Sequence, residues 1–188
     1  HVFLNRPFTP EKLRAAINGN LWRDIRIMNV EKAPDDFHAR FSATGKTYVY
    51  RVINAPVMSP FWRRFAHHEP RPLNLAAMIE SSRFFLGEHD WTAFCSAQAD
   101  GESRVRSIME LTVGSNWDPR AQANLIEFHV SANGFLRYMV RSIVGTLLDV
   151  GRGDKDSDTI QTAIVTGDRL LAGKTAAAHG LTLLNVRY

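Results

Sequence analysis

The chain has 188 residues, 45% of them hydrophobic, which is enough for one sizeable domain with a core or for two small subdomains on one sheet. No apolar run approaches the roughly 20 residues that span a bilayer, and the first residues lack the pattern of a signal peptide. The single cysteine, Cys95, excludes an internal disulfide framework and suggests a reducing compartment. We therefore expect a cytoplasmic protein with no membrane partner.

The net charge of +4 is unevenly distributed along the chain. Residues 1–72 carry a net charge of +6, whereas residues 73–188 carry −2. Arginine supplies 18 of the 23 cations, and its guanidinium fits phosphates in bidentate fashion and stacks on flat rings. This indicates a polyanionic partner, with nucleic acid first, although a merely basic protein without such a partner is the alternative.

The first half of the chain mixes helix and strand patterns. Thr9 can cap a helix whose first position is Pro10, and alternation of apolar and polar residues is typical of strands. The prediction is a helix over 10–20, strands over 24–32 and 44–54, a Pro-containing loop over 54–64, and an amphipathic helix that starts near 73 and stops near Gly87.

The second half starts with two alternating stretches and then changes to helical periodicity. The prediction is a strand pair over 107–115 and 124–132, helices over 135–151 and 157–167, and a last strand over 181–188. In the second helix, Ser157 is the expected cap and Asp158 the expected N-terminal acid. Trp91 and Phe94 are expected in the core. The whole is an α+β fold with a mostly antiparallel sheet and helices packed on one face.

Several common motifs are absent from the sequence. It has no Gly-rich phosphate loop, no Walker sequence, no zinc-spaced Cys/His cluster and no nucleophile elbow. The doublet His67-His68 beside Glu69 lacks ligand spacing, so we expect it to be solvated rather than a metal site.

The strand in "TGKTYVYRVIN" presents an unusual face. Side chains alternate along a strand, so Lys46, Tyr48 and Tyr50 should point to one side. From the residues alone, Tyr48 could simply be a half-buried strand tyrosine, which is common in sheets, and Tyr50 is a core candidate in either case.

One arginine stands out in the predicted helix over 135–151. On a helical wheel it borders a broad apolar arc that includes Met139, Ile143 and Leu147. A charge at such a border favours an anionic partner, because an unpaired charge out of water is costly. This residue, Arg141, could equally be an arginine that extends its head to solvent.

Five stretches in order resemble the TruA-type tRNA pseudouridine synthases: "DDFHARFSATGKTYVYRV", "FLGEHDWTAF", "RVRSI", "NGFLRYMVRSIVGTLLDVGRG" and "AAHGLTLLNVRY". They cover most of residues 34–188, and residues 1–33 also look like the part of the family that follows its central catalytic loop. The resemblance implies a curved antiparallel sheet, a positively charged cleft, a homodimer, uridines of the tRNA anticodon arm as substrate, and no cofactor.

The resemblance also implies roles for particular residues. Tyr48 matches the active-site tyrosine, which can stack on the flipped base and manage a proton, and Lys46 would lie near a phosphate or the base edge. Arg141 matches the arginine that pairs with the catalytic aspartate and would keep it ionised. Leu181 matches the apolar floor of the uracil pocket, a role compatible with core packing. The candidate RNA contacts are Arg40, Arg51, Arg63, Arg64, Arg104 and Arg106.

One departure from the family pattern concerns the nucleophile. The family's aspartate stands in a Gly-Arg-x-Asp-x-Gly-Val-His stretch, which these 188 residues lack. The aspartates that we considered have no such context, so none is assigned the role: Asp24, Asp35, Asp36 and Asp90. We expect residues 1–188 to be a catalytic-type domain corresponding to the C-terminal two-thirds of the enzyme, inactive alone. A non-catalytic RNA-binding module is the rival hypothesis.

Overall fold

The computed structural model describes residues 1–98 and 103–188. These residues form two compact units, His1–Ala43 and Thr44–Tyr188. The expected single catalytic-type domain stays a prediction.

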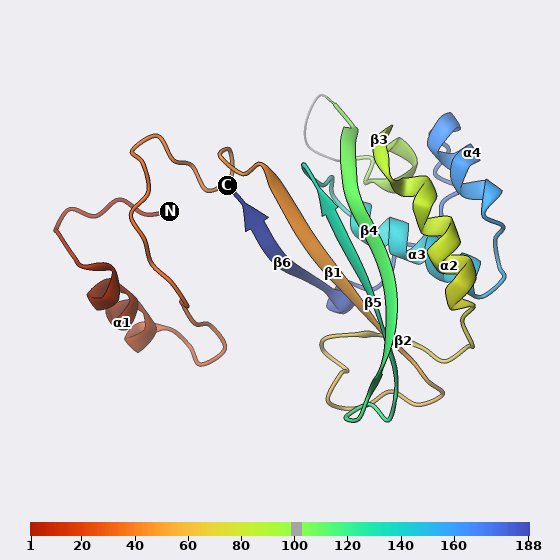
Figure 1. Cartoon of the computed structure of the whole chain (residues 1–188), viewed down its shortest axis with the longest axis horizontal. Coiled ribbons are helices and arrows are strands. Elements are labelled where there is room, and N and C mark those ends of the chain that lie inside the picture. The colour runs from red at the N-terminus through yellow and green to blue at the C-terminus, as the bar shows by residue number, and fades with distance from the viewer. Residues whose placement is uncertain (99–102) are drawn as a thin grey trace. The chain divides into compact units, whose positions relative to one another are not determined.

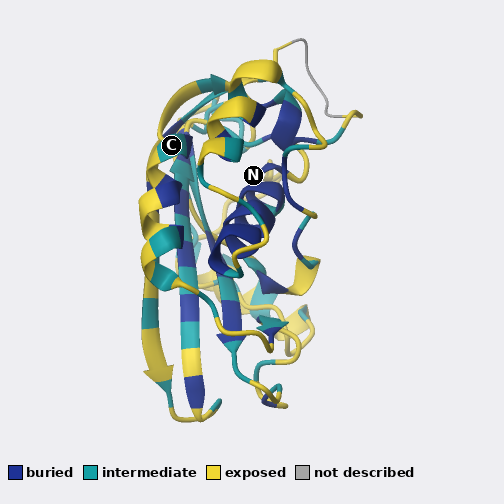
Figure 2. Ribbon diagram, turned by 90° about the vertical axis from the view of Figure 1, so that its right-hand side faces the viewer, coloured by how far each residue is buried: buried dark blue, intermediate teal, exposed yellow. Residues whose placement is uncertain are grey.

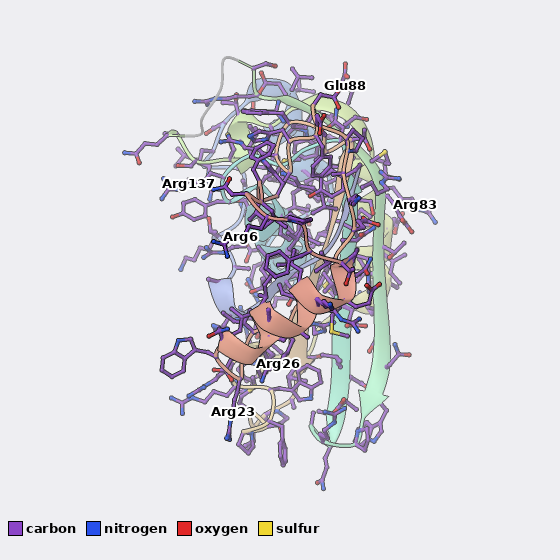
Figure 3. All side chains as sticks on the ribbon, turned by 90° about the vertical axis from the view of Figure 1, so that its left-hand side faces the viewer. Arg6, Arg23, Arg26, Arg83, Glu88 and Arg137 are labelled. Atoms are coloured by element: carbon purple, nitrogen blue, oxygen red, sulfur yellow. The ribbon has the colours of Figure 1, made fainter. Side chains whose placement is uncertain are left out.

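The first unit contains the expected helix and little else that is regular. Helix α1 spans Pro10–Asn20, with the Thr9 hydroxyl accepting a hydrogen bond from the Lys12 amide at 3.4 Å. No residue of this unit is buried, and its arginines Arg6, Arg23 and Arg26, labelled in Figure 3, are exposed.

The strand predicted over 24–32 is wrong, because this segment has no regular structure. A strand needs a neighbour for its backbone groups, and His1–Ala43 contains no strand to supply one. Instead, the Asn18 side chain accepts from the Ile27 amide at 2.8 Å and donates to the Ile27 carbonyl at 2.9 Å. One side chain of α1 thus bonds the backbone of Ile27 as a neighbouring strand would.

The second unit is built on one sheet of six strands (Figure 1). The strands are β1 Gly45–Asn54, β2 His67–Glu69, β3 Gly87–Asp90, β4 Val105–Asp118, β5 Ala123–Ala132 and β6 Leu181–Arg187. Their order is β2-β1-β5-β4-β3, and β6 also pairs with β1. Only β1 and β2 run parallel among the strand pairs of the described residues, which confirms a mostly antiparallel sheet.

Figure 1 shows the α-helices of this unit on one face of the sheet. They are α2 Leu75–Ser82, α3 Met139–Gly151 and α4 Asp158–Thr166. Short 3₁₀ turns also occur in this unit, at Arg83–Phe85, Thr92–Phe94 and Ala178–Gly180. The predicted α+β class and the number of helices in this unit are confirmed, whereas α2 is shorter than predicted and α3 begins four residues later, at Met139. The Ser157 side chain makes no capping bond at α4.

The core lies between the helices and the side chains that alternate along β1 and β5. Tyr50 and Val52 are fully buried and face Phe128 and Ile126 across the strand pair. Helix α3 closes this core, and Figure 2 shows it buried along almost its whole length. Trp91 is fully buried, and so is Phe94, as predicted.

Two short strands escaped the sequence analysis, and one of them changes the view of the histidine doublet. His67 and His68 lie in β2 and are half-buried rather than fully solvated. The His68 ring nitrogen Nε2 lies 2.8 Å from the Ala55 carbonyl oxygen. The loop between β1 and β2 is as predicted, and Trp62 fastens it by donating to the Asp118 carboxylate at 3.0 Å.

Candidate active site

Tyr48 lies on the helix-covered side of β1, between Val130 of β5 and Leu183 of β6. Its ring meets the Phe135 ring edge-on, with the centroids 5.1 Å apart. The side chain is half-buried, and this burial raises the pKa of its phenol. Within the described part of the chain, the Tyr48 hydroxyl has no hydrogen-bond partner. A ring fixed by packing with an unengaged hydroxyl is suited to act on something that enters from outside.

Tyr50, two residues along the same strand, has a different environment. It is fully buried and donates its hydroxyl proton to the Ala177 carbonyl at 2.7 Å. Burial raises its pKa, and the positive charge of Arg141 partly offsets that rise. Tyr50 is therefore a core residue whose hydroxyl has a hydrogen-bond partner. Because it lies beside Arg141, this face of β1 is next to the first turn of α3.

Arg141 is the one residue of α3 that is not buried, and it is half-exposed at the first turn. Its Nε donates to the Ala176 carbonyl at 2.6 Å, while its own carbonyl accepts from the Ala176 amide at 3.0 Å. No carboxylate of the residues that the structure describes lies within ion-pairing distance of it. Of two acidic residues in this unit that could have paired with it, Glu127 binds Arg51 and Asp149 binds Arg152.

Close backbone contact explains how Ala176 and Ala177 reach these side chains. A Cβ at Gly145 would collide with the Lys174 carbonyl, so only glycine lets the segment 173–177 lie against α3. The Gly173 amide is then bound by the Thr146 hydroxyl at 2.8 Å. This packing places the carbonyls of Ala176 and Ala177 at Arg141 and Tyr50.

Residues 82–188 match the family described as tRNA pseudouridine synthase. The chain is 43% identical over 180 residues to tRNA pseudouridine synthase A of Geobacillus sp. (strain WCH70), covering 96% of this chain and 70% of that protein. It is 41% identical to tRNA pseudouridine synthase A of Listeria innocua (96% and 71% covered), and 38% identical to tRNA pseudouridine synthase A 2 of Clostridium tetani (95% and 69% covered).

The chain belongs to the tRNA pseudouridine synthase family. The resemblance seen in the sequence is confirmed, and so are the tRNA pseudouridine synthase function and the isomerase class. Across the described residues, no helix has the length and apolar character needed to cross a membrane.

The structure places two further predicted residues of this synthase beside the tyrosines. Lys46 is half-buried on the same face of β1 as Tyr48, opposite Ala132 and Val186. Leu181 pairs with Tyr50 across β1 and β6 and packs against the core. Leu181 is thus nearer to Tyr50 than to Tyr48 in strand register, and core packing accounts for at least part of its position.

The arginines predicted to contact RNA do not all belong to the same unit. The Arg106 guanidinium lies against Gly134, in the turn that carries Phe135, because a Cβ at Gly134 would meet its Nε at 3.3 Å. Arg104 donates to the Ala97 carbonyl at 3.3 Å. Neither arginine has an ion-pair partner in the described part of the chain. Arg40 belongs to the first unit, where it lies over the Phe41 ring at 5.7 Å.

Two aromatic residues near the site were missed from the sequence. The helix predicted over 135–151 includes Phe135, but Phe135 precedes α3 and packs on Tyr48. Tyr138 was given no role, yet its ring lies 5.1 Å from the guanidinium carbon of Arg141. The turn signal Asn133-Gly134 places the predicted helix start at Phe135, and residue type gives no sign of the left-handed Tyr138 that delays it.

Proposed function

We propose that this synthase converts uridine of the tRNA anticodon arm into pseudouridine at the site formed by Tyr48 and Arg141. The reaction breaks the bond between the sugar and N1 of uracil, turns the base, and joins the sugar to C5, which then loses its proton. The atoms and the oxidation state of the nucleoside are unchanged, so the chemistry requires no oxidant and no cofactor. It does require a carboxylate nucleophile, a platform for the extruded base and a group that handles the C5 proton.

One observation carries the assignment of the site: Arg141 stands half-exposed beside Tyr50, with a backbone carbonyl as acceptor and no carboxylate within reach in the described residues. An arginine placed at an apolar border is stabilised by an ionised partner. We infer that this partner is the nucleophilic aspartate and that it lies outside residues 1–188, where the Gly-Arg-x-Asp stretch would be found.

The other predicted residues have roles around this pair. Tyr48 stacks on the extruded base, and its unengaged hydroxyl manages the proton. Lys46 binds a phosphate or the base edge, and Leu181 lies under the uracil. Contacts to the flanking RNA come from Arg40, Arg104 and Arg106. We also propose a cytoplasmic homodimer, which sedimentation of the full-length protein would test.

The two tyrosines of β1 provide a matched pair of variants for testing the site. In the full-length protein, with any residues that precede His1, Tyr48→Phe should keep tRNA affinity but cut the single-turnover rate of tritium release from C5-labelled tRNA. The loss should reach about 10²-fold, as for other positioned proton-transfer groups. Tyr50→Phe removes an equivalent hydroxyl that is already bonded to Ala177, so its rate should match the parent.

The outcomes of this experiment separate the hypotheses. If Tyr48→Phe releases tritium at the parental rate, the hydroxyl has no part in catalysis and Tyr48 is only a platform. If the full-length protein binds tRNA but releases no tritium, the chain is an RNA-binding module and the proposed function is wrong. Anticodon-arm and acceptor-arm transcripts, labelled separately, identify the substrate region.

A further inference from the structure

Tyr138 has a backbone conformation that tyrosine rarely adopts. Its φ is +67°, and among the described residues only Gln122 and Tyr138 combine a positive φ with a side chain. Gln122 lies in the turn between β4 and β5, a common place for such a residue, but Tyr138 is the residue that starts α3. Glycine or asparagine would adopt this conformation with less strain. Such a strained residue at the edge of a site points to a function of its side chain.

The strained position of Tyr138 is not explained by helix capping. It makes no capping hydrogen bond to α3, and 42% of the residue is exposed, so neither the helix start nor the core requires a tyrosine here. What the ring does contact is two cations. The guanidinium carbons of Arg137 and Arg141 each lie 5.1 Å from its centroid, and Arg137 also approaches the Tyr138 hydroxyl at 3.4 Å.

These contacts fix the guanidinium of Arg141 on two sides. Its Nε is bound to the Ala176 carbonyl, and the Tyr138 ring lies within cation–π distance of the guanidinium carbon. Within the described residues, its two terminal nitrogens have no hydrogen-bond partner. They are the pair of donors that can bind a carboxylate in bidentate geometry.

We propose that Tyr138 is a positioning residue of the synthase, which holds the Arg141 guanidinium so that its terminal nitrogens face the nucleophilic carboxylate. This inference rests on the proposed function, because it requires Arg141 to act in catalysis. On this inference, the left-handed backbone of Tyr138 serves catalysis and not folding. Only in this conformation does the ring lie against the first turn of α3, and the strain is the cost of placing it there.

The test uses variants in which stability and rate move in opposite directions. Tyr138→Gly and Tyr138→Asn relieve the strained φ, and both residues are good helix N-caps, so the melting temperature of the full-length protein should stay equal or rise. Both remove the ring, so the single-turnover rate on tRNA should fall about tenfold, within the range of one cation–π contact. If Tyr138 had only a structural role, both substitutions would lower the melting temperature, and the single-turnover rate would fall only to the extent that the protein unfolds. Parental rates in both variants overturn the inference.

Two control variants separate the ring from its neighbours. Tyr138→Phe keeps the ring face and should turn over within about twofold of the parent. Arg137, labelled in Figure 3 and exposed, contacts the ring from the preceding position. Arg137→Leu removes this second cation, and a rate loss as large as that of Tyr138→Gly would show that the ring acts through Arg137 and not through Arg141, which overturns the inference. A Tyr138→Phe variant as slow as Tyr138→Gly would show that the hydroxyl matters and not the ring, and the inference would fall.

A double substitution shows whether Tyr138 acts through Arg141. If it does, Arg141→Met combined with Tyr138→Gly should be no slower than Arg141→Met alone. Additive losses would mean that the ring acts elsewhere, which overturns the inference but leaves the proposed function intact. If Arg141→Met itself turns over at the parental rate, the proposed role of Arg141 fails first, and the inference fails with it.

Discussion

The two ends of helix α3 each carry an arginine, and the two arginines have opposite surroundings. Arg152, at the C-terminal end, is 13% exposed and binds three carboxylates, those of Glu69 at 2.8 Å, Asp154 at 2.9 Å and Asp149. Arg141, at the N-terminal end, binds a backbone carbonyl and an aromatic ring but no carboxylate of the described residues. Arg141 lies in the first turn of α3 and Arg152 is its C-cap, so attachment to the same helix does not explain the contrast.

The contrast separates a structural arginine from one available for function. The carboxylates around Arg152 come from β2, from α3 itself and from the residues that follow it, so the cluster joins the edge of the sheet to the end of the helix. Burial opposes the charge of Arg152, but hydrogen bonds to Asp154 and Glu69 outweigh it and raise its pKa. The terminal nitrogens of Arg141 have no hydrogen-bond partner among residues 1–98 and 103–188, which is the arrangement expected of a group that binds a partner from outside.

The largest effect is expected on folding, from Arg152→Met. This change leaves Glu69 and Asp149, which are both nearly buried, without their common counter-charge. Breaking a buried ion pair by removing one partner typically costs about 3–5 kcal/mol. Urea unfolding of a polypeptide of residues 1–188 should show this loss. The matched change Arg141→Met should cost only about 1 kcal/mol, for one hydrogen bond to Ala176. Equal losses would erase the distinction between the two arginines.

When catalysis is measured, the order of the two effects should be reversed, so that Arg141→Met causes the larger loss. Arg141→Met in the full-length protein removes the counter-charge of the proposed nucleophile, and the single-turnover rate on tRNA should fall about 10²–10³-fold. Arg152→Met, assayed at a temperature where it stays folded, should turn over at close to the parental rate. A rate loss in Arg152→Met as large as that in Arg141→Met, with the folded fraction verified by circular dichroism, would contradict the separation of roles.

The sequence predicted the parts of this contrast that depend on local patterns. The alternation in β1 and the helical periodicity of α3 were visible and led to the correct sheet class. The candidate site came from the resemblance to the family, because the residues alone left the roles of Tyr48 and Arg141 open. The cluster around Arg152 was not visible, because Glu69 and Arg152 are 83 residues apart and β2 has only three residues. A three-residue strand has no periodicity to detect, and its identity depends on pairing with β1.

The errors also have physical causes. The segment over 24–32 alternates as a strand should, but it has no neighbouring strand within its unit, and Asn18 bonds the backbone of Ile27 instead. Helix α3 starts at Met139 because Tyr138 has a left-handed backbone, which residue type alone would not predict for tyrosine. Long-range pairing and strained backbone are set by tertiary structure, so single-residue patterns miss both.

A smaller effect concerns RNA affinity near the start of α3. Arg106 lies against the turn at Gly134 and has no ion pair among the described residues. Arg106→Gln should therefore weaken tRNA binding and reduce the slope of log K against log salt by about 0.7–0.9, the amount for one phosphate contact. Filter binding of the full-length protein across a salt series measures it. Arg71→Gln is the control, since Arg71 is engaged with Asp154 at 2.9 Å, and it should leave the slope unchanged.

The smallest expected effect is a pH dependence confined to the Arg152 end of the molecule. His67 of β2 lies near Glu69, Arg152, His68 and His179, and burial lowers its pKa, with Glu69 opposing that shift. The unfolded chain therefore binds a proton more readily than the native one, so the stability that neutral His67 contributes is complete above about pH 6.5 and is lost as the pH falls through its lower native pKa.

His67→Gln should remove this part of the pH dependence. Urea unfolding between pH 7.5 and 5 should show the parent losing more stability than the variant as the pH falls, while the single-turnover rate of the folded enzyme responds equally to pH in both. The reason is position: His67 lies near the charges around Arg152 and is not among the groups that surround Arg141.

If the two unfolding profiles run parallel, burial does not suppress protonation of His67, and the Arg152 end is no more sensitive to pH than the rest of the sheet. If the substitution changes the pH profile of the rate instead, the two ends of α3 are coupled, and the division between a structural and a functional arginine is too simple.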